Sequence, residues 1–434
     1  MPIDFDLTPD QRALKYTVRE FARDVLRPVA EHADALGDPQ EAFTAMQPAY
    51  EQAHAMGLAT GFLPREYGGG GYSGVDFLIA VEELCAVDPG FPTILLVNGL
   101  ALMPLLWFGT EQQREKWIGR ATAASSPDFL AGWVVSERGG TANFDHPRSN
   151  AGIQVVADHD RATGEYVLNG EKHWPCNAGG WDLHGADVNV CVVRTDRHAG
   201  GKDGLSGVLV ERGTPGVEYE VIDKSAHRTC QNVTMTFRNA RVPEQNLFAE
   251  GDGDLLVNRA FTWSGPVAAI AAVGVARAAY EFALKWARTY TGGGSTPIID
   301  HQAVGNLLVD VAARIEAGRY LSWKAAHYMD RHDSEGHALG AMNKTFCGDA
   351  MQSVVFDCMR IVGVNSLDKK FGMEKLYRES LVFPLYDAGS LAMQRRRAWG
   401  VMADPAFSPD VFVDSEPFGF KKSMEGYGAV APIG

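Results

Sequence analysis

Two short runs near the C-terminal end, residues 383–390 (FPLYDAGS) and 394–397 (QRRR), decide how the rest of the chain is interpreted. The first run sets one carboxylate, Asp387, between apolar residues and a small-residue turn, and the second supplies three cations. Burial raises the pKa of an Asp above about 3.9, whereas nearby arginines lower it. Such opposed effects are how a site tunes a base, so Asp387 is a candidate catalytic base. The alternative is a loop Asp that caps a helix beginning near Ser390, with the arginines on its solvated face.

The composition is that of an ordinary globular protein. The chain has 434 residues, of which 46% are hydrophobic and 22% are charged, so two or three domains with large cores are expected. The formal net charge of −14 argues against nucleic acid or an anionic membrane surface as the main partner. The only local basic run, residues 395–397, is too short to reverse that balance.

The cysteines and the N-terminus indicate a cytoplasmic protein. No CxxC pair and no disulfide framework is present, so the cysteines are expected to be reduced thiols. They are Cys85, Cys176, Cys191, Cys230, Cys347 and Cys358. Residues 1–12 are acidic and polar, unlike a secretory signal. The most apolar run, residues 92–108, falls below the roughly 20 residues that a membrane-spanning helix needs.

Residues 1–130 are predicted to form an N-terminal helical domain. Thr8 followed by Gln11 makes a capping box, and apolar residues recur after it at helical spacing. Further helices are expected at residues 75–87 and 110–118. The glycine run at residues 68–71 lacks the Lys-Ser/Thr pair of a phosphate loop, so it is interpreted as a connecting loop.

Residues 131–245 are predicted to form a middle β-domain. Apolar and polar residues alternate with period two in several segments, namely 166–168, 188–194, 207–211, 217–222 and 233–237. The dipeptides Asn169-Gly170 and Gly200-Gly201 are typical of turns between strands. Five or more strands in this length favour a small β-barrel or sandwich, which residues 241–243 close.

Residues 246–404 are predicted to form a C-terminal helical bundle. Helix is expected to resume from about residue 255, with an Ala- and Gly-rich part at residues 265–285. Long helices are expected to follow at residues 301–328, 338–362 and 374–380. Residues 405–434, punctuated by Pro and Gly, are expected to be a tail that wraps another surface or is partly disordered. The predicted fold class is therefore α+β, with helices, then a β-domain, then a helical bundle.

Six motifs in register carry a resemblance to a known family. They are PREYGG at residues 64–69, EEL at 82–84, SERGGTAN at 136–143, GEKHWPCN at 170–177, FRNARVP at 237–243 and EKLYRE at 374–379. In their order and spacing they resemble the acyl-CoA dehydrogenase superfamily of flavoproteins. The resemblance implies an N-terminal helical domain, a middle β-barrel, a C-terminal four-helix bundle, bound FAD and a homo-oligomer, expected to be a homotetramer or a dimer.

Within that superfamily the sequence most resembles the nitroalkane oxidase branch. The similar runs are 139–143, 174–182, 293–295, 298–299, 301–302, 323–325, 384–387 and 395–397. The base is Asp in that branch, as it is here, whereas fatty acyl-CoA dehydrogenases usually have Glu. Because Asp is one methylene shorter, it must approach the substrate carbon differently.

The resemblance implies roles for residues around the base. Asp387 would remove the substrate α-proton, and Ser264 stands where the oxidase has an active-site Ser near the flavin. Cys176 stands where the oxidase has a Ser close to flavin N5, and a thiol is the poorer hydrogen-bond donor. Gln394 aligns with the Arg that pairs with the oxidase's base. Arg395 is one residue further on, a helix rotation of about 100°, and both residues are candidates for tuning the base or contacting substrate.

Four more residues are expected near the flavin ring. Trp174 is expected to pack on the ring, with an ordinary core Trp as the alternative. Asn177 is expected either to bond the flavin or to cap a turn. Ser136 and Thr141 are expected to meet flavin oxygens, with bonding inside their own loop as the alternative.

The distal part of the cofactor is expected to involve the end of the bundle. Gln302 is expected near the adenosine part of FAD, across a subunit interface. The family's Arg that contacts a neighbouring subunit's flavin pyrophosphate is missing, and Arg288 is the candidate substitute. No metal site is expected, because His173 and His227 show no metal-ligand spacing with other His or Cys residues.

The resemblance implies an FAD-dependent oxidoreductase. A nitroalkane would lose its α-proton to the Asp base, electrons would pass to flavin N5, and an aldehyde or ketone and nitrite would form. The first alternative is an acyl-CoA or acyl-carrier-protein dehydrogenase that forms an α,β-unsaturated thioester. The second is a flavin-dependent N-oxygenating monooxygenase, against which the retained base weighs. A flavin-binding scaffold without activity would have lost the base or the flavin-loop residues.

Overall fold

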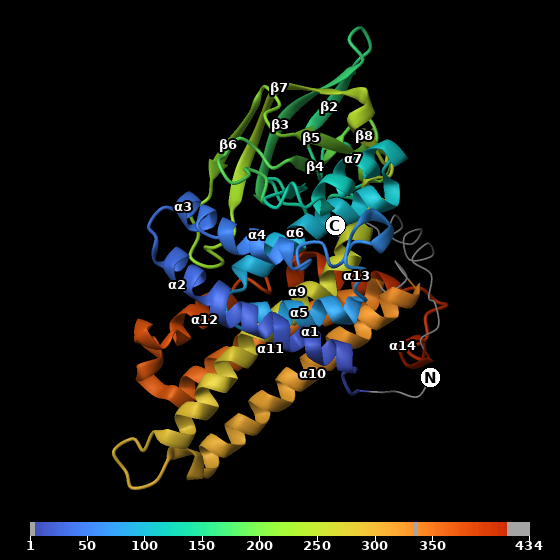
Figure 1. The fold of residues 1–434 in the computed structure, drawn as a ribbon. Coiled ribbons are helices and arrows are strands. Elements are labelled where there is room, and N and C mark those ends of the chain that lie inside the picture. Colours follow the sequence, from blue (N-terminus) through green and yellow to red (C-terminus); the bar gives the residue numbers. More distant parts are fainter. Residues whose placement is uncertain (1–4, 333–336, 415–434) are drawn as a thin grey trace.

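The computed structural model describes residues 5–332 and 337–414, which form helices, a β-sheet and a second set of helices in chain order (Figure 1). The sheet lies at the top of Figure 1, the N-terminal helices cross the middle, and the long C-terminal helices extend downwards. The α+β organisation expected from the sequence is confirmed.

The helices that precede the sheet follow the signals in the sequence. They are α1 (Pro9–Phe21), α2 (Arg27–Ala35), α3 (Pro39–Thr44), α4 (Gln47–Ala55), α5 (Gly74–Cys85), α6 (Gly90–Phe108) and α7 (Glu111–Thr122). The capping box is present, because Gln11 N–H donates to Thr8 Oγ1 (3.2 Å) and Thr8 N–H to Gln11 Oε1 (3.1 Å). The glycine run is a loop, where a Cβ at Gly69 would lie 2.2 Å from the carbonyl oxygen of Leu63.

Two apolar helices form the interior of the protein. By length and composition alone, α6 and α9 (Gly253–Thr289) are long and apolar enough to cross a membrane. However, 78% of the most apolar window of α6 and 72% of that of α9 are buried inside the protein. This burial is typical of core helices in a folded domain.

The strands form one sheet that partly closes on itself. They are β1 (Ala131–Val134), β2 (Val156–Asp160), β3 (Glu165–Cys176), β4 (Val188–Arg194), β5 (Leu205–Glu211), β6 (Val217–Val221), β7 (Asn232–Pro243) and β8 (Leu247–Phe248). Their order is β6-β7-β3-β1-β4-β5-β8. Because β2 pairs with both β3 and β4, which flank β1, this part of the sheet curls as in a small barrel. The short helix α8 (Gly201–Gly204) joins β4 to β5.

Two details of the sheet differ from the sequence-based expectation. Asn169-Gly170 does not form a turn but lies inside β3, where the register shifts after Leu168 and Gly170 adopts a φ of +125°. This is a β-bulge, for which Gly is suited because it has no Cβ. The strands β1, β2 and β8 were not expected, because β1 is buried without alternation and β8 has two residues.

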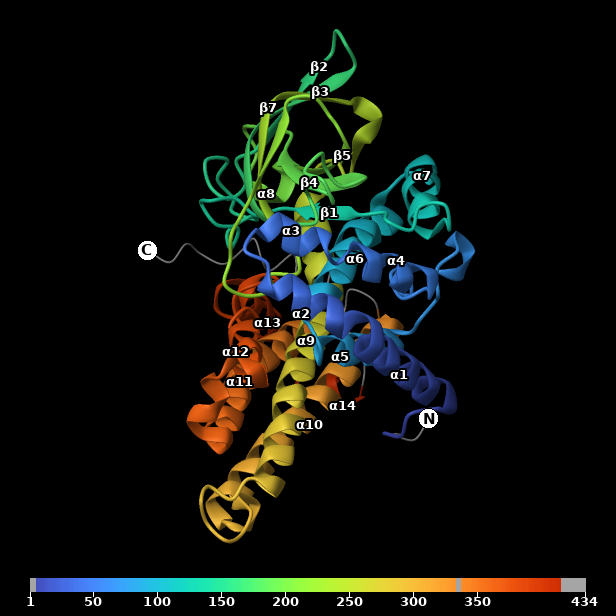
Figure 2. The ribbon, with the colours of Figure 1, turned by 60° about the vertical axis from the view of Figure 1, so that its left-hand side comes forward.

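The C-terminal helices pack around α9. They are α10 (Gln302–His332), α11 (His337–Val362), α12 (Met373–Ser380), α13 (Arg395–Met402) and α14 (Val411–Asp414). Figures 1 and 2 both show α9, α10 and α11 side by side. Helix α9 begins at Gly253, close to the expected residue 255, and continues through Pro266. Burial of the residues around Pro266 compensates for the backbone hydrogen bond that proline cannot make.

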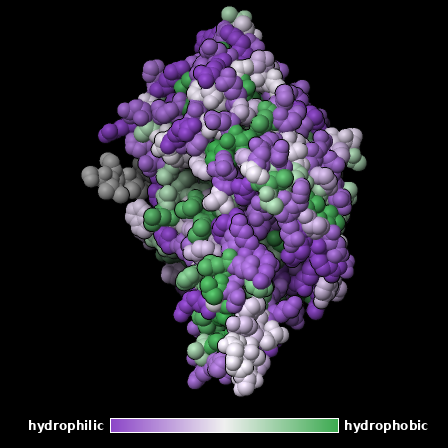
Figure 3. All heavy atoms as spheres, turned by 90° about the vertical axis from the view of Figure 1, so that its left-hand side faces the viewer, coloured by the Kyte–Doolittle hydropathy of each residue, from purple (hydrophilic) through white to green (hydrophobic). Residues whose placement is uncertain are grey.

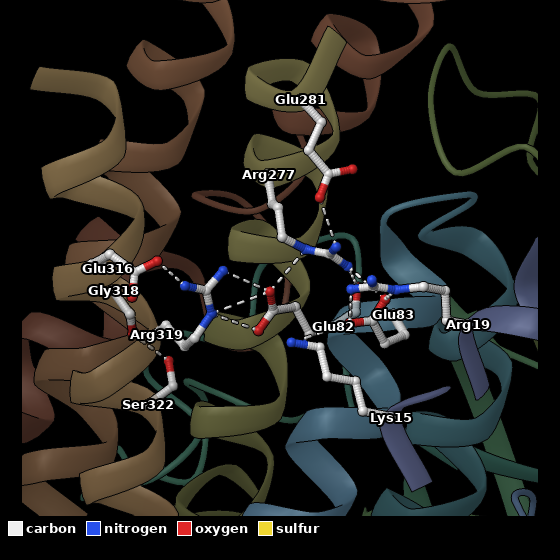
Figure 4. Close-up of polar contacts among 10 residues, drawn as sticks. All are labelled: Lys15, Arg19, Glu82, Glu83, Arg277, Glu281, Glu316, Gly318, Arg319 and Ser322. Atoms are coloured by element: carbon white, nitrogen blue, oxygen red, sulfur yellow. Dashed lines mark hydrogen bonds and ion pairs between the residues drawn. The ribbon is translucent and has the colours of Figure 1, made fainter. Parts of the chain in front are cut away.

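A buried cluster of charges joins α5 to the surrounding helices (Figure 4). The Glu82 carboxylate pairs with Arg277 Nε (2.9 Å) and Arg319 Nη2 (2.8 Å). The Glu83 carboxylate pairs with Arg277 Nη2 (2.9 Å) and Arg19 Nε (2.9 Å). Both glutamates are almost fully buried, so each carboxylate depends on these guanidinium partners to offset the loss of hydration.

The end of the chain is described only in part. Residues 404–414 form turns and α14. The rest of the predicted tail, residues 415–434, lies outside the described residues.

Replacing Arg277 by Met should lower the free energy of unfolding by about 3–5 kcal/mol, because it leaves two buried carboxylates short of a partner. Denaturant unfolding followed by far-UV circular dichroism measures the change. The matched control is Arg23→Met, which breaks an exposed pair with Asp24 and should leave the midpoint unchanged. Equal midpoints for Arg277→Met and the wild type would contradict a stabilising role for the cluster.

Candidate functional site

Asp387 lies on a strained turn between α12 and a π-helical segment, Gly389–Gln394. The φ angles of Asp387, Ala388 and Gly389 are +49°, +68° and +60°. Left-handed conformations are costly for residues with a side chain and concentrate at functional sites. The helix-capping alternative for Asp387 is wrong, because Ala388 stands at the cap position and no side chain caps the segment.

The Asp387 carboxylate forms a hydrogen bond with Ser264, the other residue predicted to lie at the base. Ser264 Oγ, from the middle of α9, donates to Asp387 Oδ1 over 2.6 Å. Asp387 Oδ2 is buried and has no hydrogen-bond partner among residues 5–332 and 337–414. One carboxylate oxygen is thus held in place while the other remains available to a substrate proton.

The surroundings raise the pKa of Asp387 above its ordinary value. Burial is the largest effect, and it is opposed by the charge of Lys344, the hydrogen bond from Ser264 and the charge of Arg397. Lys344 itself is buried on α11, where Nζ donates to the carbonyl oxygen of Phe383 (2.9 Å). Burial lowers the pKa of Lys344 to about 8, although Asp387 opposes this effect.

The residues after the base are placed differently from the expectation. Gln394 does not touch the carboxylate of Asp387; its Nε2 donates to the Asp387 backbone oxygen (3.0 Å). Arg395 points away and pairs with Asp349 (2.6 Å), so its predicted tuning role finds no support in this geometry. Arg397 is fully buried and donates to Gln394 Oε1 (2.9 Å). The guanidinium that acts on Asp387 is therefore the one at position 397.

Lys344 and the separate role of Arg397 are not predicted by the sequence. The run QRRR at residues 394–397 does not show which guanidinium turns inwards. Lys344 carried a weak signal, since it is a lone cation on a helix side that buries Gly340, Ala341 and Cys347. A lysine on the apolar face of a helix is buried only where it has a partner.

The turn at the end of β3 brings Trp174 and Cys176 towards the same region. Trp174 has a φ of +74° and its ring is 50% exposed, so the alternative of an ordinary core Trp does not apply. Asn232 donates to the Trp174 carbonyl oxygen (2.6 Å) and to Cys176 Sγ (2.9 Å). The turn is thus held against the start of β7.

Contacts through His227 connect this turn with the base. Cys230, two residues before the Asn232 that donates to Cys176 Sγ, itself donates to the His227 carbonyl oxygen (3.3 Å). The His227 ring packs edge-on against the Tyr386 ring, with 5.8 Å between centroids. Because Tyr386 precedes Asp387, the end of β3 and the base belong to one site.

Ser136 lies beside the same turn, just after β1. Its carbonyl oxygen accepts the His173 N–H (2.8 Å), and Lys172 holds the next residue, Glu137, through an ion pair of 2.9 Å. Thr141 follows in the same loop and is half-buried, and its carbonyl oxygen accepts the Phe144 N–H (3.0 Å).

Gln302 and Arg288 lie apart from this cluster, whereas Asn177 directly follows Cys176. Asn177 is fully buried, and its Nδ2 donates to the Ile94 carbonyl oxygen (3.0 Å), a contact typical of a structural role. Arg288 and Gln302 are exposed at the end of α9 and the start of α10. That end of the bundle forms the lower tip in Figures 1 and 2, far from the sheet, so within one chain neither residue joins the base.

The site has the features that a flavin ring requires. The half-exposed Trp174 ring offers an apolar surface, and polar groups stand next to it in the loop after β1. Asp387 Oδ2 and the Tyr386 hydroxyl are buried polar groups without a partner in the described part of the chain. Buried polar groups of this kind usually meet a ligand or an ordered water. Among the residues that the structure describes, no group of three His, Cys, Asp or Glu side chains is placed to hold a metal ion.

Comparisons with known proteins agree on one family. The model of the acyl-CoA dehydrogenase N-terminal domain matches residues 8–125, and that of the C-terminal domain matches residues 251–399. Nitroalkane oxidase from Fusarium oxysporum is 31% identical over 94% of this chain and 96% of its own length. An acyl-CoA dehydrogenase from Bacillus subtilis is 29% identical over 90% of this chain and 97% of its own length.

Solved structures show the same similarity. A nitroalkane oxidase crystallised with the competitive inhibitor spermine superposes with a TM-score of 0.89 at 30% identity, covering 95% of this chain and all of that chain (100%). Butyryl-CoA dehydrogenase from Megasphaera elsdenii shares the fold, with a TM-score of 0.82 at 24% identity, covering 92% of this chain and 100% of its own.

Asp387→Asn should make the folded protein more stable at neutral pH. Because the pKa of Asp387 is raised on folding, its ionised form is disfavoured in the folded state. This free-energy cost is absent below about pH 3.9, the pKa of an Asp in the unfolded chain. It grows as the pH rises from there towards the pKa of Asp387 in the folded protein. The thermal midpoint should therefore rise at pH 7–8, with the difference shrinking towards pH 4.

The control for this measurement is Asp349→Asn, which removes a carboxylate that pairs with the half-exposed Arg395. It should not raise the midpoint. If Asp387→Asn destabilises the protein at every pH, the surroundings of Asp387 favour its charge, contrary to the geometry described above.

Proposed function

The chain belongs to the acyl-CoA dehydrogenase family, and we propose that it is a flavin-dependent oxidoreductase that converts nitroalkanes to aldehydes or ketones with release of nitrite. Its similarity to nitroalkane oxidases of known structure extends over 95% of the chain. The acyl-CoA dehydrogenases among its relatives supply the second candidate function.

The observation that carries the proposal is the pair formed by Asp387 and Ser264. The hydrogen bond of 2.6 Å fixes one carboxylate oxygen, and the other has no partner within the described residues. The α-proton of a nitroalkane is acidic enough for a carboxylate to remove it outright. A carboxylate whose pKa is raised by burial is a stronger base for this proton.

Each group near the base has a distinct part in this reaction. Asp387 takes the α-proton at Oδ2, while Ser264 holds Oδ1 and orients the carboxylate. Lys344 and Arg397 favour the ionised form that accepts the proton, because their charges oppose the effect of burial. Bound FAD would accept the two electrons of the deprotonated substrate and transfer them to oxygen.

Several residues would hold FAD. Trp174 would pack on the flavin ring beside Cys176, and Ser136 and Thr141 would donate to its oxygens. The half-exposed Trp174 ring supports this arrangement. Gln302 and Arg288 would bind the distal part of FAD in a neighbouring subunit, and their exposure at the tip of the bundle is consistent with this role.

The proposed assembly is a cytoplasmic homotetramer. Figure 3 shows apolar side chains gathered in a hollow below the β-domain and over the helices beneath it. Exposed apolar residues on α11 and in the segment that joins it to α12 include Phe356, Val364 and Leu367. Apolar surface of this kind is typical of subunit contacts. The six free cysteines support a reducing compartment.

The second candidate is a dehydrogenase of acyl-CoA or acyl-carrier-protein thioesters. Gln394 favours it, because this residue stands where the oxidase branch has an Arg and brings no charge to the base. An acyl thioester is deprotonated at its α-carbon as well, so Asp387 and Ser264 would have the same roles. The N-oxygenating monooxygenase needs no carboxylate base, and the geometry around Asp387 weighs against it.

The decisive experiment mixes the purified yellow protein anaerobically with nitroethane, and separately with a short acyl-CoA, while absorbance near 450 nm is recorded. Bleaching with nitroethane, followed by nitrite release when air is admitted, is the expected result. Bleaching only with the thioester would replace the oxidase by the dehydrogenase. Bleaching with neither would contradict both.

Asp387→Asn tests the role of Asp387 in the same bleaching experiment. It should keep its flavin absorbance but lose about 10²–10⁴-fold or more in the rate of bleaching, the usual contribution of a general base. Wild-type rates in this variant would exclude Asp387 as the base.

The acidic limb of the pH profile should depend on Lys344. Lys344→Met removes a cation that lowers the pKa of Asp387, so the pKa of the base rises. On the acidic limb, kcat/KM rises with pH as the base loses its proton. This limb should therefore move to higher pH. Lys344→Arg keeps the charge and should keep the limb. Arg395→Met, at a residue paired with Asp349, should also leave it in place. An unmoved limb in Lys344→Met would contradict this role.

A further inference from the structure

Two cysteines from separate parts of the chain meet at the edge of the site. Cys176 is the last residue of β3 and lies opposite Asn232 in the β3–β7 ladder. Cys230 lies two residues before Asn232, which faces Cys176 in that ladder and donates to Cys176 Sγ (2.9 Å), and the two thiols shift each other's pKa. Both are free thiols, Cys230 is buried, and Cys176 is partly exposed.

A cation and an amide polarise this pair of thiols. Lys224 Nζ donates to Cys230 Sγ over 3.2 Å. Asn232 Nδ2 donates to Cys176 Sγ over 2.9 Å, and Lys224 also donates to Asn232 Oδ1. A lysine beside a thiol stabilises the thiolate, which is the reactive form of cysteine.

We propose that Cys176 and Cys230 form a redox-active dithiol that a hydroperoxide converts to a disulfide. The Cys230 thiolate attacks a peroxide oxygen, the O–O bond breaks, and the leaving hydroxide takes a proton to become water. Cys176 then attacks the sulfur of the resulting sulfenic acid, its own proton leaves with the oxygen as a second water, and the S–S bond forms. Two thiols and one hydrogen peroxide thus give one disulfide and two waters.

The other cysteines lack this environment. The hydrogen bond from Cys176 and the charge of Lys224 hold the pKa of Cys230 well below its usual value. The hydrogen bond to Cys230 and burial raise the pKa of Cys176. By contrast, burial raises the pKa of Cys191, Cys347 and Cys358 to about 12, which makes these thiols unreactive.

The pair is connected to the catalytic segment. Cys230 Sγ donates to the His227 carbonyl oxygen (3.3 Å), and the His227 ring packs on Tyr386 next to the base. A disulfide replaces the hydrogen bonds of both thiols, including the one from Cys230 to His227. Its formation should therefore alter the packing of His227 on the segment that carries Asp387. This inference rests on the proposed function for its supply of peroxide. An oxidase that transfers electrons to oxygen produces hydrogen peroxide in its own active site, beside Cys176.

The test uses the full-length holoprotein, reduced with dithiothreitol, desalted and then treated with hydrogen peroxide. After denaturation in N-ethylmaleimide, mass spectrometry of the peptides should show Cys176 linked to Cys230, two hydrogens lighter than the separate thiols. Dithiothreitol should reverse the link. Cys191, Cys347 and Cys358 serve as internal controls and should remain alkylated.

Lys224→Met should slow formation of the link by about tenfold, because the thiolate fraction of Cys230 falls. Cys230→Ser should abolish the link and leave the remaining cysteines alkylated. Alkylation of both Cys176 and Cys230 after peroxide treatment, or an unchanged rate in Lys224→Met, would overturn the proposal. Since peroxide is added directly, the outcome does not depend on nitroalkane turnover, so failure of one proposal is distinguishable from failure of the other.

Discussion

The pairing of the buried carboxylates of α5 with guanidinium groups from three helices is the interaction on which the arrangement of the helical core depends. Glu82 and Glu83 have lost their hydration, and α1, α9 and α10 each supply a cation to them. Such charges tolerate little change of position, because an unpaired buried charge costs several kcal/mol. Arg277 contacts both carboxylates, and this fixes the position of α9.

The position of α9 in turn determines the site. Ser264 lies about 20 Å from Arg277 along the same helix, as the rise per residue requires. There its hydroxyl donates to Asp387, which arrives from a segment more than a hundred residues later in the chain. The site is thus built where a rigid core helix meets a strained turn. The π-helical segment that follows adds one residue per turn there, as is common at functional sites.

The strain and the unsatisfied groups of the site have a common explanation. Asp387 and Ala388 both have positive φ, and Asp387 Oδ2 and the Tyr386 hydroxyl are buried without a partner in the described residues. These features lower stability and are retained where a ligand is expected to compensate for them. Lys344 and Arg397 limit the cost at Asp387, because their charges act against the effect of burial on its pKa.

The sequence by itself determined the α+β organisation, the helices with strong caps and periodicity, and the choice of Asp387 as the proposed base, since these depend on local patterns and on six motifs in register. Only the tertiary structure decided which cations act on Asp387. Arg395, Arg396 and Arg397 look alike in sequence, yet helical rotation directs Arg395 to Asp349, Arg396 to Asp145 and Arg397 into the core. Lys344 and the meeting of Cys176 with Cys230 were likewise invisible, because burial and contact between distant segments are properties of packing and not of local sequence.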